Sequence, residues 1–257
     1  MRLVTRLRLR WIRRRPFSPE WRRILERTFP RYLYLSPGDR DELERHIQVF
    51  LAEKQFEGAA GQPITDEVRV TIAAQACFLL LHRDTAVYPR LFSIIVYPGE
   101  YAAHDRRRDE RGFINEGVQI RRGETAGRGA LVLSWSDVLQ DASDIHSGRN
   151  VVFHEFAHEL DREGGSFDGA PVLPKPAMNR TWARTLSEEF HALRGRLARN
   201  EPTDLDPYGA TNPAEFFAVV TESFFQRPHE LRQTHPKLYE ELERFYRQDP
   251  ASTLPPA

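Results

Sequence analysis

Cysteine is almost missing from this sequence: Cys77 is the only one in 257 residues. A single thiol excludes an internal disulfide framework and a zinc site made of cysteines, and it favours a reducing compartment. Long apolar runs are missing too, since the longest, ACFLLL at 76–81, is far shorter than the roughly 20 residues that span a bilayer. With no apolar secretory core at the N-terminus, we expect a cytoplasmic protein without a transmembrane segment.

A net charge is also absent, because 37 Lys and Arg balance 37 Asp and Glu. No overall field attracts nucleic acid, so direct nucleic-acid binding is not expected. The exception is local: the first 15 residues hold seven arginines and no acid. We expect residues 1–17 to form a solvated arm, with contact to a membrane surface or a nucleic acid as the alternative. Residues 18–250 then form a single domain, and 251–257 form a tail.

The hydrophobic periodicity predicts an α+β fold that is mostly helical and has a small sheet. Thr65 can cap a helix that starts at residue 66, and the near-continuous apolar sequence beyond it predicts the central core helix. Other helices are predicted at 18–29, 36–58, 151–163, 178–199, 213–226 and 236–247. Strands are predicted at 91–98 and 129–138, with weak pairing at 117–120, whereas 104–112 is predicted to be an exposed connection.

The segment VVFHEFAHELD, at 151–161, contains the pattern H-E-x-x-H. On a helix, His154 and His158 lie one turn apart on the same face and can share one zinc ion, with Glu155 close to the open metal position. The same period places a broad apolar face elsewhere on the helix, made of Phe153, Phe156, Ala157 and Leu160. A core helix has no need of a second stripe of imidazoles, so the pattern favours a metal-binding catalytic helix.

A third ligand must come from elsewhere in the chain. The metzincin pattern is excluded, because Asp161 and Gly164 stand where it needs glycine and histidine. A third histidine ligand could come from one of four positions, but no pattern around them points to function: His146, His191, His229 and His235. Asp161 is a candidate for orienting His158 or His154 by a hydrogen bond, and a simple carboxylate at a helix end is the alternative.

Two glutamates in NPAEFFAVVTESFF stand out, because the surrounding residues are so apolar that the helix must be buried on most sides. Glu215 and Glu222 are seven residues apart and share a face, so one can bind zinc while the other supports a ligand histidine. An unpaired buried carboxylate is costly, and a cation removes that cost. We favour Glu215 as the ligand, although Asn212, Pro213 and Glu215 also fit a helix start that needs no metal.

With these segments identified, the chain resembles the Mlc titration factor A family of zinc-dependent peptidases, whose fold is similar to the catalytic domain of anthrax lethal factor. The resemblance runs from about Phe50 to Pro250 and rests on TDEVRVTIAAQACFLLL, IIVYPGEY, LVLSWSDV, VVFHEFAHELD and DPYGATNPAEFFAVVTESFF in this order. It implies a zincin-like peptidase domain in which one zinc ion is held by His154, His158 and Glu215. It also implies that Glu155 is the general base and that Tyr208 hydrogen-bonds the oxyanion.

From the residues alone, Tyr208 in DPYG would simply be a turn tyrosine, and this stays the alternative to the oxyanion role. The resemblance implies an aminopeptidase that removes small apolar residues from a peptide or protein substrate, and an endopeptidase is the variant that stays open. It also implies a regulatory alternative, in which the protein binds and sequesters an Mlc-like transcription repressor. The 129–138 strand precedes the predicted zinc helix, and we expect it either to pair with an extended substrate or to be an interior strand without a free edge.

Overall fold

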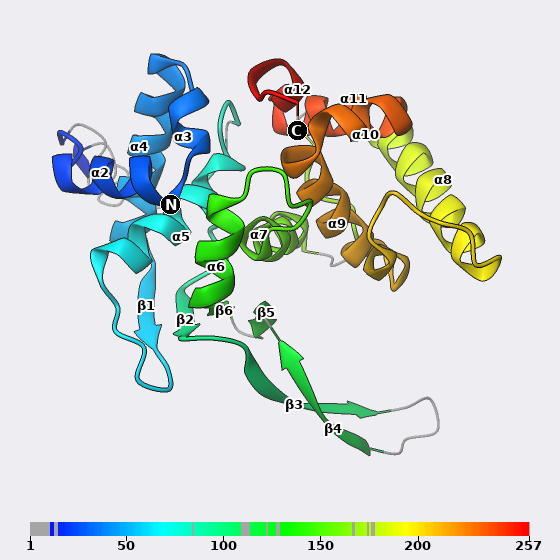
Figure 1. Cartoon of the computed structure of the whole chain (residues 1–257), viewed down its shortest axis with the longest axis horizontal. Coiled ribbons are helices and arrows are strands. Elements are labelled where there is room, and N and C mark those ends of the chain that lie inside the picture. Colours follow the sequence, from blue (N-terminus) through cyan, green and yellow to red (C-terminus); the bar gives the residue numbers. More distant parts are fainter. Residues whose placement is uncertain are drawn as a thin grey trace.

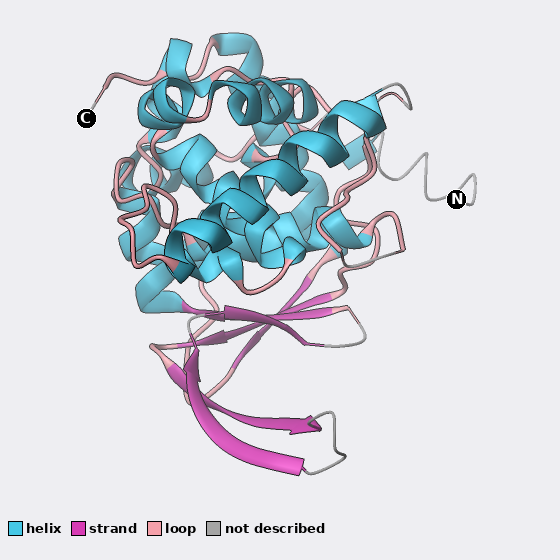
Figure 2. Cartoon of the chain, turned by 90° about the vertical axis from the view of Figure 1, so that its right-hand side faces the viewer, coloured by secondary structure: helices cyan, strands magenta, loops and turns pink. Residues whose placement is uncertain are grey.

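The computed structural model describes residues 11–12, 15–83, 85–108, 114–121, 123–126, 129–165, 168–173, 175 and 178–256. The helices gather on one side of a small sheet, which confirms the expected mostly helical α+β class (Figures 1 and 2). None of the helices in this described part of the chain combines the length and the apolar character needed to cross a membrane.

Within residues 15–83, the N-terminal part of the fold contains the helices α2 (Pro19–Thr28), α3 (Arg31–Tyr34), α4 (Pro37–Glu53) and α5 (Asp66–Phe78). The predicted cap of α5 is confirmed, because the Thr65 side chain accepts the N–H of Val68 at 3.3 Å. Every residue of α5 from Val70 to Phe78 is buried, as the apolar sequence predicts. The helix predicted over 36–58 is too long, since α4 ends at Glu53 and the chain then forms strand β1 (Gln55–Gly58).

The main sheet has the order β1, β2 (Ser93–Tyr97), β6 (Ala130–Ser134) and β5 (Gly123–Ala126). The first three strands are parallel, and β5 is antiparallel to β6. Strand β6 therefore has a partner on both edges, so substrate pairing along the 129–138 strand is wrong and the interior alternative is confirmed. The expected strand is also too long, because the Ser134 side chain caps helix α6 (Trp135–Ser143).

The segment after β2 forms a hairpin of β3 (Tyr101–Arg108) and β4 (Ile114–Arg121), which extends away from the body (Figure 1). The exposed connection predicted at 104–112 is wrong for 104–108, because these residues pair in register with β4, and 109–112 lie outside the described residues. The weak pairing predicted at 117–120 is confirmed as part of β4. The polar residues at 104–108 suggested a connection and not a strand. They can still form an antiparallel hairpin, because a two-stranded hairpin does not need an apolar face that is buried.

The C-terminal half is helical, and its boundaries follow the predicted ones closely. It contains α7 (Val151–Arg162), α8 (Asn179–Ala198), the 3-10 turn η2 (Pro207–Ala210), α9 (Pro213–Gln226), α10 (Pro228–Thr234), α11 (Pro236–Tyr246) and α12 (Pro250–Thr253). Most of these helices begin with proline, whose missing N–H costs nothing in the first turn.

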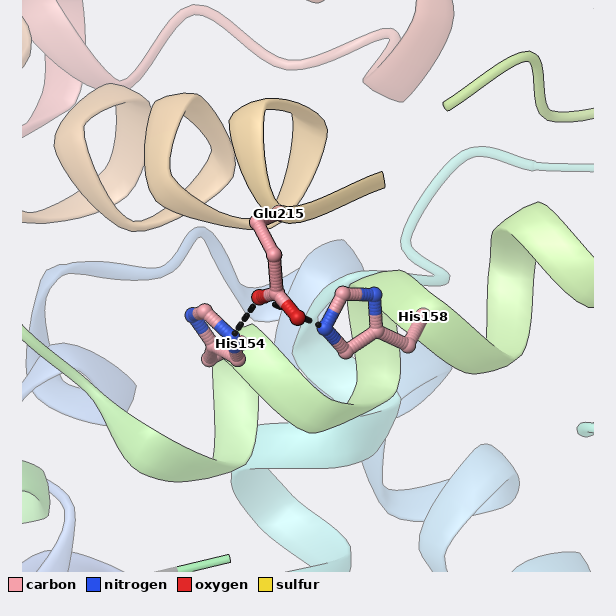
Figure 3. A group of neighbouring side chains, drawn as sticks. All are labelled: His154, His158 and Glu215. Carbon is pink, nitrogen blue, oxygen red and sulfur yellow. Dashed lines mark hydrogen bonds and ion pairs between the residues drawn. The ribbon is translucent and has the colours of Figure 1, made fainter. Parts of the chain in front are cut away.

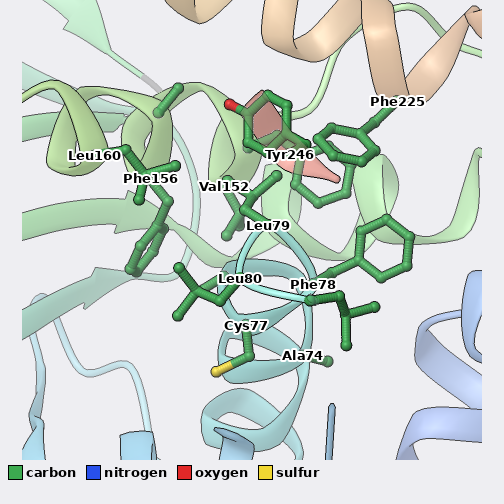
Figure 4. Close-up of a cluster of buried hydrophobic side chains, with 14 of the residues drawn as sticks. Ala74, Cys77, Phe78, Leu79, Leu80, Val152, Phe156, Leu160, Phe225 and Tyr246 are labelled. Atoms are coloured by element: carbon green, nitrogen blue, oxygen red, sulfur yellow. The ribbon is translucent and has the colours of Figure 1, made fainter. Parts of the chain in front are cut away.

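The core joins α5, α7, α9 and α11. Figure 4 shows Phe78 at the end of α5 and Leu80 in the turn after it, beneath Val152 and Phe156 of α7, with Tyr246 of α11 beside them. Aromatic rings meet at this junction, since the ring centroids of Phe78 and Phe153 are 6.0 Å apart and those of Phe153 and Phe225 are 5.4 Å apart. Burial of these rings stabilises the packing of α7 against α5 and α9.

Candidate metal centre

Helix α7 begins in a dense set of hydrogen bonds. The Asn150 side chain accepts the N–H of Phe153 at 2.8 Å, which confirms its predicted role as the cap. The backbone N–H groups of Asn150 and Val151 donate to the carboxylates of Glu222 and Asp141, at 2.7 and 2.8 Å. The N–H groups of Asn150, Val151 and Phe153 therefore have acceptors inside the protein. These hydrogen bonds fix where α7 starts relative to α9.

The two faces of α7 are as the periodicity predicts. Phe153, Phe156 and Ala157 are fully buried in the core. The side chains of His154 and His158 retain 14% and 6% exposure on the other face, where α9 passes. Glu155 follows His154 and is 6% exposed. The apolar face thus fixes the rotation of α7 and directs both histidines towards α9.

Glu215 in the first turn of α9 completes a group with these histidines (Figure 3). Its Oε2 atom lies 3.1 Å from Nε2 of His154 and 3.3 Å from Nε2 of His158. One ligand atom from each of the three residues lies within 4.8 Å of the other two. The Asn212 side chain also caps α9 by accepting the N–H of Glu215, so the helix-start alternative holds together with the metal-facing carboxylate.

This donor set fits a divalent metal ion such as zinc. Zinc binds histidine nitrogen and carboxylate oxygen at about 2.0–2.2 Å, so neighbouring donors around a tetrahedral ion are roughly 3.4 Å apart. The two nitrogen to oxygen separations at Glu215 come within a few tenths of an ångström of that value. Two imidazoles and one carboxylate also leave a fourth position open, which is the arrangement of catalytic zinc sites.

Glu222 lies two turns further along α9 and contacts the other nitrogen of His154. Its Oε2 atom is 2.8 Å from Nδ1 of His154, while its Oε1 atom accepts the N–H of Asn150. A carboxylate that accepts Nδ1–H leaves the lone pair of Nε2 directed at the ligand group. The structure thus brings Glu222 to a histidine of the candidate metal group, as its spacing from Glu215 predicts.

The charges of this group are strongly coupled. Burial opposes a charge on His154, but Glu222 and the hydrogen bonds to Glu215 and Glu222 outweigh burial and raise the pKa of His154 well above its usual value. Burial would raise the pKa of Glu215, but hydrogen bonds from His154 and His158 hold that pKa well below its usual range. A positive charge is therefore favoured at the centre of the group, and a metal ion supplies it by displacing protons.

Tyr208 lies beside this group in the turn η2, and its ring centroid is 6.0 Å from that of His154. The side chain is 53% exposed, so it borders the solvent side of the group. Asp206 fixes the turn through both carboxylate oxygens. Its Oδ1 accepts the N–H of Tyr208 at 2.9 Å, and its Oδ2 accepts a hydrogen bond from the Arg149 guanidinium at 2.7 Å. Asp206 and Arg149 were not predicted, although an Asp before Pro207 is a recognisable capping signal.

Asp161 is fully buried at the end of α7. Its Oδ2 atom accepts the N–H of Gly169 at 2.8 Å. Burial raises the pKa of Asp161, and the N–H of Gly169 opposes that shift. The carboxylate therefore ties the chain after α7 to the helix, and its expected role in orienting a ligand histidine stays a prediction.

His229 and His235 have partners outside the group. His235 pairs with Glu189 and Asp204, and His229 contacts the carbonyl of Leu254. Among the described residues a second set with metal-ligand spacing occurs at Asp39, Glu42 and His82, where the His82 side chain is 40% exposed. The group around Glu215 is the more enclosed one and is the candidate metal centre.

Comparison with known proteins agrees with this geometry. The family model described as glucose-regulated metallo-peptidase M90 matches residues 3–247. An uncharacterized protein of Synechocystis is 43% identical over 237 residues, which are 92% of this chain and 86% of the relative. Mlc titration factor A of Serratia proteamaculans is 34% identical over 226 residues, which are 86% of this chain and 85% of the relative. The Mlc titration factor A of Pectobacterium atrosepticum is 31% identical over 230 residues, which are 88% of this chain and 86% of the relative.

The resemblance read from the sequence motifs is thus confirmed, and it is longer than those motifs suggested. The match starts at residue 3 and includes the arginine-rich segment, instead of starting near Phe50. A family of metallopeptidases implies a bound metal, and His154, His158 and Glu215 are the residues that the structure brings together for one. The chain belongs to the glucose-regulated metallo-peptidase M90 family.

Proposed function

We propose that this protein is a zinc-dependent peptidase with a zincin-like fold, in which His154, His158 and Glu215 hold one zinc ion. The observation that carries the proposal is the convergence of three ligand atoms from α7 and α9 within 4.8 Å of one another. Glu222 supports this arrangement through its contact with His154. The separations at Glu215 favour a small tetrahedral ion, and the donor set of two imidazoles and one carboxylate is typical of catalytic zinc.

A zinc ion held by His154, His158 and Glu215 would supply a Lewis acid able to polarise a peptide carbonyl and to lower the pKa of water to about 7. Glu155 takes the proton from the water as its oxygen attacks the carbonyl carbon, and delivers that proton to the amine as the carbon–nitrogen bond breaks. The Tyr208 hydroxyl donates a hydrogen bond to the oxyanion, and its position beside His154 supports this role. Asp206 and Arg149 hold the turn that carries Tyr208.

The test is the Glu155→Gln variant, which keeps the shape of the side chain and removes its basicity. We expect wild-type protein with one zinc to cleave peptides, and Glu155→Gln to bind zinc equally and lose at least roughly 100-fold in kcat. Glu188→Gln, an exposed change in α8, is the matched control and should leave kcat unchanged. Full activity of Glu155→Gln would refute the proposed base.

We propose an aminopeptidase that acts on apolar N-terminal residues, and an endopeptidase is the competing specificity. Parallel assays of one peptide with a free and with an acetylated N-terminus separate the two. An aminopeptidase cleaves only the free peptide. Equal cleavage of both would contradict this specificity.

A second candidate function is the sequestration of an Mlc-like transcription repressor. The names of the relatives from Serratia proteamaculans and Pectobacterium atrosepticum favour it, because both are Mlc titration factors. The same Glu155→Gln variant separates the two functions. If the variant releases an Mlc-like repressor from its operator as well as wild type does, binding and not hydrolysis is the regulatory event.

We place the peptidase domain at residues 18–250, after an arginine-rich arm at 1–17 and before a tail at 251–257, and we propose a cytoplasmic location. The single cysteine, Cys77, supports the location because it is fully buried and leaves no disulfide to form. Limited proteolysis tests the boundaries, with cleavage expected before residue 18.

A further inference from the structure

A cavity of about 770 Å³ lies between one face of α8 and the segment 168–173. Its walls are mainly apolar, and they include aliphatic and aromatic side chains from the segment 168–173, α8 and α9: Val172, Leu173, Trp182, Leu186, Phe190 and Phe216. Sites for small ligands and side chains have volumes of roughly 300–1,000 Å³ and walls of this kind. The cavity is therefore large enough to hold a large apolar side chain.

The cavity begins where the two ligand-bearing helices meet. Gly169, which lines it, is held to α7 through Asp161, one turn after His158. The same glycine lies against α9, because a Cβ atom on Gly169 would be 2.3 Å from the carbonyl oxygen of Pro213. Pro213 and Phe216 line the cavity on either side of Glu215 in the sequence. The wall of the cavity is thus continuous with the elements that carry the metal ligands.

The charged groups around the cavity select against acidic occupants. Its described lining contains one carboxylate, Asp168, one histidine, His191, and no lysine or arginine, so an acidic side chain finds no permanently charged cation to pair with. Val172 at the wall is 53% exposed, so the wall presents apolar side-chain surface to solvent. An apolar occupant removes this surface from water, whereas an anionic occupant loses its hydration without a full counter-charge.

We propose that this cavity binds a large apolar side chain of the peptide substrate, such as leucine or phenylalanine, next to the bond that is cleaved. The proposal rests on the zinc peptidase function proposed above. It extends the small apolar residue that the family resemblance implies to larger ones, because the cavity has room for a full aromatic side chain.

The test uses alanine pentapeptides, with free and acetylated N-termini, in which one position is Gly, Leu, Phe or Lys. Mass spectrometry of the products gives the cleaved bond and kcat/KM. We expect the kcat/KM of wild type to be at least roughly 10-fold higher with Leu or Phe than with Gly next to that bond. One methylene group in a fitted pocket changes kcat/KM by roughly 10–200-fold. Ala183→Trp, which fills the cavity from α8, should abolish this preference and leave kcat/KM for the Gly peptide unchanged.

Arg184→Trp is the matched control, because Arg184 is the exposed neighbour that does not line the cavity, and it should keep the wild-type preference. Ser187→Phe fills the cavity one turn further along α8 and repeats the test if Ala183→Trp does not fold. Equal cleavage of the Gly and Phe peptides by wild type, or an unchanged preference in the filled variants, overturns the cavity assignment alone. Absence of any hydrolysis by the zinc-loaded protein overturns the proposed function and this assignment together.

Discussion

Replacing Glu222 by alanine should weaken metal binding although Glu222 is not itself a proposed ligand. In the structure its carboxylate contacts Nδ1 of His154 at 2.8 Å and accepts the N–H of Asn150 at 2.7 Å. Glu222→Ala removes the group that holds the His154 ring with Nε2 directed at the metal. It also leaves the buried N–H at the start of α7 without its acceptor.

The expected magnitude follows from these two contacts. Loss of a carboxylate that orients a ligand histidine typically weakens metal affinity by about 10–100-fold, which is about 1.4–2.7 kcal/mol. A buried N–H without an acceptor costs about 1–3 kcal/mol of folding free energy. Each kcal/mol of lost unfolding free energy lowers the melting temperature of a chain of this size by about 2–4 °C. Glu222→Gln keeps an acceptor oxygen, so its losses should be smaller in both quantities.

The assay is competition for zinc against a chelator of known affinity, with thermal unfolding measured on the same samples. Glu188→Ala, an exposed substitution in α8, is the control and should change neither quantity. If Glu222→Ala binds zinc as tightly as wild type, the contact with His154 has no part in holding the metal, and our account of why α9 carries two glutamates fails.

Three further predictions concern the surroundings of the site. Asp206→Ala releases the turn that carries Tyr208, so kcat should fall by up to roughly 100-fold at unchanged zinc content; an unchanged kcat would show that the turn is held without Asp206. Gly169→Ala should destabilise the fold by about 1–3 kcal/mol in urea, because φ is +76° and the added Cβ would meet the Pro213 carbonyl; equal stability would refute the close approach. Hydrogen bonding to Glu189 raises the pKa of His235 despite burial, and Asp204 adds to the rise. The stability that His235 contributes is therefore complete below about pH 6.5 and is lost as pH rises through the raised pKa, so His235→Gln should cost more at pH 6 than at pH 9; a cost that grows with pH would have the wrong sign.

Much of the candidate site could be predicted because its signals are local. The period of α7 separates His154 and His158 from the apolar face within three turns of helix, and the structure places both faces as predicted. Glu215 and Glu222 could be predicted because carboxylates in so apolar a helix need partners, and both find them on α7. The contact of Glu222 with Asn150 joins residues 72 positions apart, and no local pattern contains it.

The sheet was harder to predict, because its signals are not local. Strand β1 has only four residues, and only its register with β2 makes it a strand. Strand β6 ends at Ser134 because the hydroxyl of this residue caps helix α6. The apolar residues on both sides of Ser134 would fit a longer strand equally well, so the sequence does not show where the strand ends. Residues 168–173 and 179–191 face each other across the cavity beside α8. The hydrogen bond from Gly169 to Asp161 holds the first segment there, and no local sequence pattern contains this contact.

The most direct test of the account is the zinc content of purified protein measured by mass spectrometry, for wild type and for Glu215→Ala and Glu222→Ala. The account predicts one zinc per chain in wild type, none retained by Glu215→Ala after dialysis against a weak chelator, and weakened but stoichiometric binding by Glu222→Ala when zinc is supplied in excess. Zinc retained by Glu215→Ala and lost from Glu222→Ala would contradict the central claim that His154, His158 and Glu215 hold the metal.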